Sequence, residues 1–169
     1  SSIFRDKRGQ NLLILRAVFK LHPKFRLPEH PKIDFLKDND KSTAISLRKA
    51  VLKLRSHFPD PTLKHNAGSF FLNPTITKQK ADQLRTKYHD IAARPYDLRH
   101  EQVSAGWLLE SAGFKGTRIG SFYFHKKHAN MVINESPSTT GKEVAEFIET
   151  VQLKIAEKFG ISIVAEPLL

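Results

Sequence analysis

Residues 140–160, TGKEVAEFIETVQLKIAEKFG, predict a long amphipathic helix whose beginning and end are both marked in the sequence. Thr140 and Glu143 have the spacing of a capping box, and Gly160 is a natural carboxyl-terminal stop. The apolar side chains recur at steps of three and four and form one stripe: Val144, Phe147, Ile148, Val151, Ile155 and Phe159. Such a stripe needs an apolar partner surface, so the elements around this helix determine the fold class.

Strands and further helices are expected on both sides of this helix. The stretch 119–134 alternates unevenly and predicts two strands around a turn at Lys126-Lys127, and 161–164 predicts another strand. Alternating apolar residues in 11–21 predict a strand with one wet face. Periodic patterns predict helices near 42–58 and 77–89, and a short helix that carries Trp107. These elements interleave without repeats, which indicates an α+β or α/β class.

Composition excludes several kinds of protein. The chain of 169 residues contains no cysteine, which excludes disulfides, zinc thiolate sites and cysteine nucleophiles. No apolar run approaches the roughly 20 residues that a membrane-spanning helix needs. The net charge of +11 suits a nucleic-acid partner, and most of the basic excess lies in residues 1–65. However, the basic residues in that region lack the aromatic interleaving typical of RNA-reading proteins, so a solvated surface is the better interpretation.

Two stretches are unusual enough to carry chemistry. Residues 65–74, HNAGSFFLNP, place Ser69 between a run of small residues and two aromatic anchors. Residues 104–116, SAGWLLESAGFKG, place Lys115 directly after a short helix. Each has a structural alternative, namely an ordinary turn into a strand and a capped core helix. His125 and His128 are too few for a metal site and would point to opposite faces of a strand, so no metal site is expected.

In this order and spacing, these stretches resemble motifs of the bacterial flavoenzyme family UDP-N-acetylenolpyruvoylglucosamine reductase, which acts in peptidoglycan precursor synthesis. The resemblance includes Pro59-Asp60-Pro61, the segment 66–74 and Ala105 to Glu110. It continues through Gly113 to Gly116 and His128-Ala129. It implies an α+β fold in which about three helices pack on a mixed sheet, flanked by strands of a truncated FAD-binding domain.

The resemblance also implies a reaction. NADPH would reduce FAD, and the flavin would pass a hydride to UDP-N-acetylglucosamine enolpyruvate to give UDP-N-acetylmuramate. Ser69 matches the proton donor, and Glu166 matches the carboxyl group that assists the enolate. A carboxyl group that hydrogen-bonds an enolate must carry or share a proton, because two anions repel. An alternative alignment puts Leu168 at the position of this glutamate.

Other residues are matched to substrate and cofactor contacts. Gly68 and Ser69 are expected beside the flavin. A family lysine near the diphosphate is replaced here, and Arg55 is the cation closest to its position in the sequence. The remaining substrate candidates are Asn73, Lys115, His128 and Tyr96.

The resemblance divides the chain into four parts: residues 1–21 as the end of the FAD-binding domain, 22–40 as a connector, 41–159 as the substrate-binding domain, and 160–169 as a return strand. Most of the flavin-binding portion would then lie before Ser1 and would be the chain's missing partner. Without it, the chain should hold FAD weakly and be inactive. A cytoplasmic location is expected, with neither a nucleic-acid nor a membrane partner. The alternatives are a UDP-sugar-binding domain without catalysis and a basic nucleic-acid-binding domain.

Overall fold

The computed structural model describes residues 9, 12–21, 24–28, 43–56, 58–60 and 63–167. The chain divides into two units, Ser1–His57 and Phe58–Leu169. Most of the predicted connector, residues 22–40, lies outside the described part of the chain. Among the described residues, no helix has the length and apolar character required to cross a membrane.

In the described residues of the first unit, one helix forms, α1 (Ala44–Arg55), where the sequence predicted a helix. Thr43 caps it, because its side chain accepts a hydrogen bond from the Ser46 backbone and its backbone donates to the Ser46 side chain. None of its residues is buried. The strand predicted over residues 11–21 is wrong for its described part, since residues 12–21 form no strand. A strand needs a paired neighbour, and the alternating side chains here stay exposed, including Leu15 at 87% and Phe19 at 80%.

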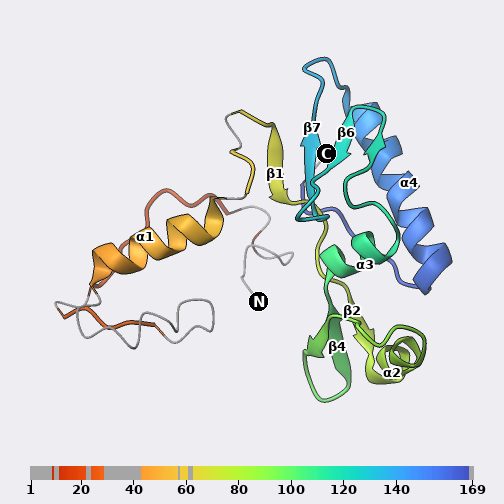
Figure 1. Ribbon diagram of the computed structural model, residues 1–169, viewed down its shortest axis with the longest axis horizontal. Coiled ribbons are helices and arrows are strands. Elements are labelled where there is room, and N and C mark those ends of the chain that lie inside the picture. Colours follow the sequence, from red (N-terminus) through yellow and green to blue (C-terminus); the bar gives the residue numbers. More distant parts are fainter. Residues whose placement is uncertain are drawn as a thin grey trace. The chain divides into compact units, whose positions relative to one another are not determined.

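The described residues of the second unit form two antiparallel sheets, where one mixed sheet within the α+β class was expected. The larger has the order β1-β7-β6-β5 and the smaller the order β2-β4-β3. Three helices accompany them (Figure 1). The bounds are β1 (Asn66–Ser69), β2 (Thr75–Thr77), α2 (Lys78–Lys87), β3 (Ala93–Pro95), β4 (His100–Val103), α3 (Ala105–Ser111), β5 (Arg118–Ile119), β6 (Phe122–Phe124), β7 (Met131–Asn134) and α4 (Gly141–Phe159).

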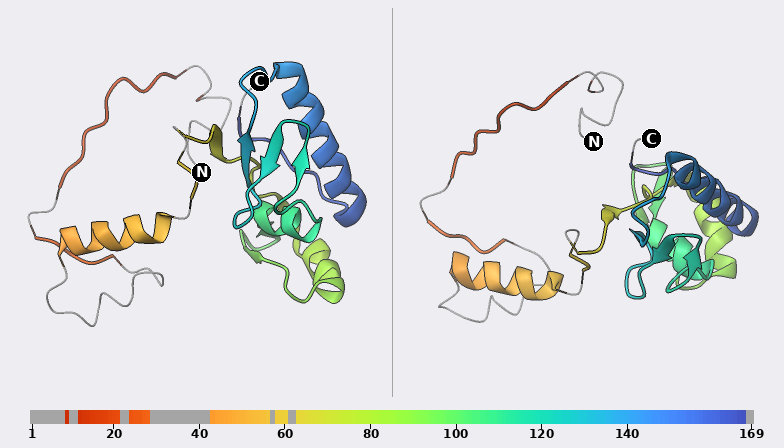
Figure 2. Two further views of the ribbon diagram at one scale, coloured as in Figure 1. Left: turned by 45° about the horizontal axis from the view of Figure 1, so that its top comes forward. Right: turned by 90° about the horizontal axis from the view of Figure 1, so that it is seen from above.

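Helix α4 covers one face of the larger sheet, and the main core lies between them (Figures 1 and 2). The ring of Phe147 lies 4.4 Å from that of Phe122 and 5.5 Å from that of Phe124, measured between centroids. The helix begins at the predicted capping box of Thr140 and Glu143. It ends at Gly160, whose left-handed backbone, at φ 61°, is the conformation that glycine adopts most readily. The predicted helix is therefore confirmed at both ends.

Helix α2 is linked to the smaller sheet by an ion pair, and Tyr88 at its carboxyl end packs against aromatic rings of the core. The ring of Trp107 on α3 packs against Tyr88 and Phe159, each 5.6 Å away. On β4 the buried carboxylate of Glu101 accepts hydrogen bonds from both terminal nitrogens of Arg85 on α2. This pairing raises the pKa of Arg85 above its ordinary value.

The strand predictions near the carboxyl end were partly right. Strands β6 and β7 lie in 119–134 as expected, and β5 adds a third strand before them. The predicted strand at 161–164 is wrong, because only an isolated bridge between Phe71 and Ala165 forms beside it. The carbonyl of Ile163 accepts instead from the side chain of Gln152 on α4, at 2.8 Å. Beside the bridge the described residues form only two backbone bonds, from the Leu72 N–H to the Val164 carbonyl and from the Glu166 N–H to the Phe70 carbonyl, and this pairing is too short to be a strand.

Candidate functional site

Ser69 lies at the end of β1, where the strand passes from an exposed edge into the core. Gly68 before it has φ 75°, a left-handed conformation that suits glycine. Phe70 and Phe71 after it are 7% and 1% exposed. The two phenyl rings therefore anchor the chain while the Ser69 side chain stays accessible to solvent.

The backbone after Ser69 is held from two directions. On one side, the Phe70 N–H donates to the Asn130 carbonyl at 2.7 Å, and the Asn130 side chain bonds the backbone of Phe71. On the other side, the Leu72 N–H donates to the Val164 carbonyl at 2.9 Å, and the Glu166 N–H donates to the Phe70 carbonyl at 2.8 Å. The predicted proton donor and the predicted carboxyl group are thus both attached to one short segment, Phe70–Leu72.

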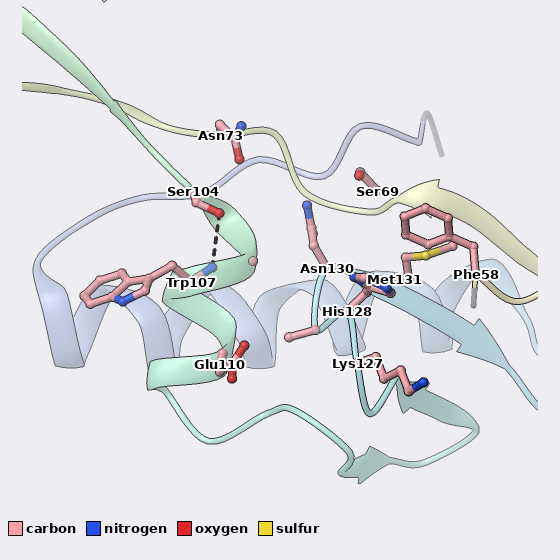
Figure 3. A pocket seen from close by; sticks show the side chains of 12 residues that line it. Phe58, Ser69, Asn73, Ser104, Trp107, Glu110, Lys127, His128, Asn130 and Met131 are labelled. Carbon is pink, nitrogen blue, oxygen red and sulfur yellow. Dashed lines mark hydrogen bonds between the residues drawn. The ribbon is translucent and has the colours of Figure 1, made fainter. Parts of the chain in front are cut away.

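A cavity of about 470 Å³ opens beside Ser69 (Figure 3). Residues from β1, α3 and the turn between β6 and β7 surround it. They are Phe58, Ser69, Asn73, Ser104, Gly106, Trp107, Glu110, Lys127, His128, Ala129, Asn130 and Met131. The structure therefore brings together three of the residues predicted from the sequence: Ser69, Asn73 and His128.

Asn73 also stabilises the helix that forms one wall of the cavity. Its side-chain oxygen accepts a hydrogen bond from the Ala105 N–H at 2.8 Å, at the amino end of α3. Ser104 caps the same end, because its hydroxyl accepts from the Trp107 N–H at 3.2 Å (Figure 3). Asn73 and Ser104 also line a second cavity of about 430 Å³, which Arg94 and Gln102 border. The shared residues make the two cavities neighbours.

His128 lies in the turn between β6 and β7. Its ring is 4.4 Å from that of Phe58 and nearly parallel to that of His125, at 5.7 Å. Among the described residues there is no group of three or more histidine, aspartate or glutamate side chains that could hold a metal ion. The His128 ring borders the cavity and packs beside the rings of Phe58 and His125.

The other predicted residues lie outside the lining of the main cavity. Lys115 forms an ion pair with Glu110, which does line it. Glu166 is exposed and reaches the site region through its backbone bond to Phe70. Tyr96 is 58% exposed on the hairpin between β3 and β4. Arg55 lies in the last turn of α1, in the first unit.

The structure adds site residues that the sequence reasoning missed. Asn130 follows His128-Ala129, and Ser104 precedes the Ala105-Gly106-Trp107 motif. Their proximity to recognised motifs was the only available signal. Glu110 and Lys127 were part of quoted stretches, but nothing in their spacing indicated that they would line one cavity with Ser69.

The open backbone at Gly68 would suit the approach of a flavin ring. At Gly68 an added Cβ atom would meet nothing within 4 Å, so the backbone beside Ser69 is open to the approach of a flat ring. Gly68 and Ser69 are the residues here that would contact it.

Comparison with known proteins agrees with these motifs. Residues 60–169 match the family model described as UDP-N-acetylenolpyruvoylglucosamine reductase, C-terminal domain. A reductase of this name from a Psychrobacter species is 35% identical across 98% of this chain, which corresponds to 47% of the relative. Another, from Bdellovibrio bacteriovorus, is 31% identical across 99% of the chain and 50% of the relative.

A third reductase of the same name, from Alcanivorax borkumensis, is 36% identical across 73% of this chain and 35% of its own length. The chain thus spans about half the length of the curated relatives that it matches along almost its whole sequence. The matched residues include the segment with Ser69, the Trp107 helix and the His128 turn. This chain therefore belongs to the UDP-N-acetylenolpyruvoylglucosamine reductase family and contains its C-terminal domain.

Proposed function

We propose that this chain supplies the substrate-binding part and the proton donor of an enzyme that reduces UDP-N-acetylglucosamine enolpyruvate to UDP-N-acetylmuramate. The observation that carries the proposal is the cavity that joins Ser69, Asn73 and His128, with Glu166 attached to the same backbone segment as Ser69. FAD, reduced by NADPH, would supply the hydride when it is bound. The flavin-binding portion would correspond to the part of the relatives that this chain does not span.

Ser69 is proposed to give its hydroxyl proton to the substrate carbon next to the carboxylate. Addition of a hydride to the neighbouring carbon of the double bond leaves an electron pair on this carbon, delocalised as an enolate. The electron pair forms the new C–H bond with the serine proton, and the serine oxygen keeps the electrons of its former O–H bond. A strongly basic acceptor makes the transfer feasible for such a weak acid. An exposed hydroxyl beside a cavity has the access that this step requires.

Glu166 is proposed to assist the enolate and the proton transfer through its carboxyl group. Its backbone N–H is bonded to the Phe70 carbonyl, one residue after Ser69. The segment of Glu166 therefore lies beside the segment of Ser69, which supports a role for both residues in one reaction. Leu168, the alternative at this position, lies outside the described residues and has no proton to share.

The neighbouring cavities suit an elongated, anionic nucleotide sugar. Their volumes, about 470 and 430 Å³, lie in the range of small-molecule sites. Lys127 borders the first and Arg94 the second, so a cation is present at each for the negative charges of a diphosphate or a carboxylate. Asn73 and Ser104, which line both cavities, are proposed to contact the sugar between them.

The test is the variant Ser69→Ala in the complete, flavin-loaded enzyme. We expect substrate-dependent turnover to fall by about 100-fold or more, because a proton donor is lost. NADPH should still reduce the flavin at the normal rate. Ser138→Ala is the matched control, since Ser138 lies between β7 and α4 and does not line the cavity. Unchanged turnover in Ser69→Ala would contradict the proposal. Binding of UDP-sugar without any turnover by the wild-type enzyme would instead favour a non-catalytic binding domain.

A further inference from the structure

We infer that Asn130 is a positioning residue for proton transfer, an inference that rests on the function proposed for Ser69. Asn130 lies in the turn before β7 and lines the cavity beside Ser69 (Figure 3). It holds the backbone of the two residues that follow Ser69. The sequence separation of 59 residues between Asn130 and Phe71 makes this a tertiary contact.

Three hydrogen bonds connect Asn130 to this backbone. Its carbonyl oxygen accepts from the Phe70 N–H at 2.7 Å. Its side-chain Oδ1 accepts from the Phe71 N–H at 2.9 Å, and its Nδ2 donates to the Phe71 carbonyl at 2.8 Å. The side-chain amide thus pairs with both polar groups of one backbone residue, which fixes the direction of the chain as well as its position.

The segment Phe70–Leu72 is also hydrogen-bonded to the segment that contains Glu166, the second proposed catalytic group. Glu166 bonds the Phe70 carbonyl, and Val164 bonds the Leu72 N–H, on the side of the segment that Asn130 leaves open. A shift of Phe70–Leu72 would therefore move Ser69 and the backbone of Glu166 together. Reacting groups tolerate little displacement, since an error of about 1 Å can slow a reaction by about 100-fold.

Asparagine is well suited to this position. Phe71 as a whole residue is 1% exposed, so its backbone N–H and carbonyl have little access to water and need partners within the protein. Alanine at position 130 would provide neither partner. Aspartate has nearly the same shape and could still accept from the Phe71 N–H, but its second oxygen would oppose the Phe71 carbonyl instead of donating to it. The two variants therefore separate the loss of both bonds from the loss of one.

The experiment measures the two half-reactions separately in the complete flavin-loaded enzyme. In Asn130→Ala and Asn130→Asp we expect substrate-driven reoxidation of the flavin to slow by about 10-fold to 100-fold, while NADPH-driven reduction stays within about twofold of the wild type. The solvent deuterium isotope effect on reoxidation should rise, because proton transfer becomes the slower step. A change confined to stability would not raise this isotope effect.

Asn134→Ala is the matched control. Asn134 also accepts two hydrogen bonds in the loop after β7, from the Ser136 N–H at 3.0 Å and the Thr139 hydroxyl at 2.8 Å. It should lower stability without changing the isotope effect. Normal reoxidation in both Asn130 variants, with Ser69→Ala still impaired, would overturn the positioning role alone. Normal reoxidation in Ser69→Ala itself would overturn the proposed function, and this inference with it.

Discussion

At the scale of single residues, Asn73 combines a structural contact with a place in the cavity. Its Oδ1 accepts from the Ala105 N–H, which satisfies one of the unpaired amides at the start of α3. Its side chain also borders both neighbouring cavities. Substitution of Asn73 by alanine would not distinguish the two roles, because it removes the hydrogen bond to Ala105 and the cavity contact together.

Asn73→Asp separates these roles. Aspartate keeps an oxygen for the Ala105 N–H, so we expect the free energy of unfolding to stay within about 1 kcal/mol of the wild type. It replaces the amide donor by a negative charge, so UDP-sugar should bind at least about tenfold more weakly through like-charge repulsion. Urea denaturation and calorimetric titration with UDP-N-acetylglucosamine would measure the two effects. Equal affinity for the nucleotide sugar in both proteins would remove Asn73 from the substrate contacts.

At the scale of elements, the turn between β3 and β4 depends on one carboxylate. Asp97 Oδ1 accepts from the backbone N–H groups of Arg99 at 2.7 Å and His100 at 2.8 Å. The bond from Arg99 is the main reason that the pKa of Asp97 lies below its ordinary value, and the His100 side chain lowers it further. The charged form of Asp97 therefore stabilises this turn, which carries Tyr96.

A lowered pKa determines the direction of the pH dependence. Asp97 contributes its stabilisation above the pKa of the unfolded chain and loses it as the pH falls through the lower, folded pKa. We expect the amide proton signals of Arg99 and His100 to move towards unbonded positions in an NMR titration from about pH 5 to about pH 2. In Asp97→Asn, which keeps the acceptor oxygen but cannot titrate, these signals should stay constant. Parallel shifts in both proteins would assign the transition to another group.

The elements also show which features could be predicted from the sequence. Helix α4 was predicted in full because Thr140, Glu143 and Gly160 act within one turn of its ends. Residues 12–21 and 161–164 have the alternation of strands but not their pairing, which depends on segments elsewhere in the chain. Local signals therefore predicted the helices more reliably than the strands.

The site was also predicted only in part, because the sequence shows local motifs but not the long-range bonds between them. Ser69 and Asn73 belong to one short segment, so a single motif located both. The bond between Asn130 and Phe71 joins residues 59 positions apart and has no periodic signature. The pairing of Val164 and Glu166 with the segment after Ser69 was missed because it too depends on tertiary structure.

At the scale of the whole molecule, the core formed by the described residues lies in the second unit. Every described residue of the main apolar cluster lies between Phe70 and Ala165, whereas α1 buries none of its residues. The only tryptophan, Trp107, packs in this cluster against Phe159. Its fluorescence therefore reports on the second unit.

We expect a chain of residues 58–169 to fold independently. Its free energy of unfolding, followed by Trp107 fluorescence in urea, should agree within about 1 kcal/mol with that of the 169-residue chain, because no described core contact is removed. A single cooperative transition should be seen in both. A loss well beyond this margin would show that residues 1–57 stabilise the second unit.

The bridge between Phe71 and Ala165 has a consequence for folding during synthesis. It joins segments near the two ends of the second unit, so its closure costs more chain entropy than the local pairing of β6 with β7. While the ribosome still covers residues 164–166, the emerging chain could form its larger sheet but could hold the backbone after Ser69 only from the Asn130 side. Translation products that stop before this segment would therefore lack the bonds from Val164 and Glu166 that hold the residues after Ser69.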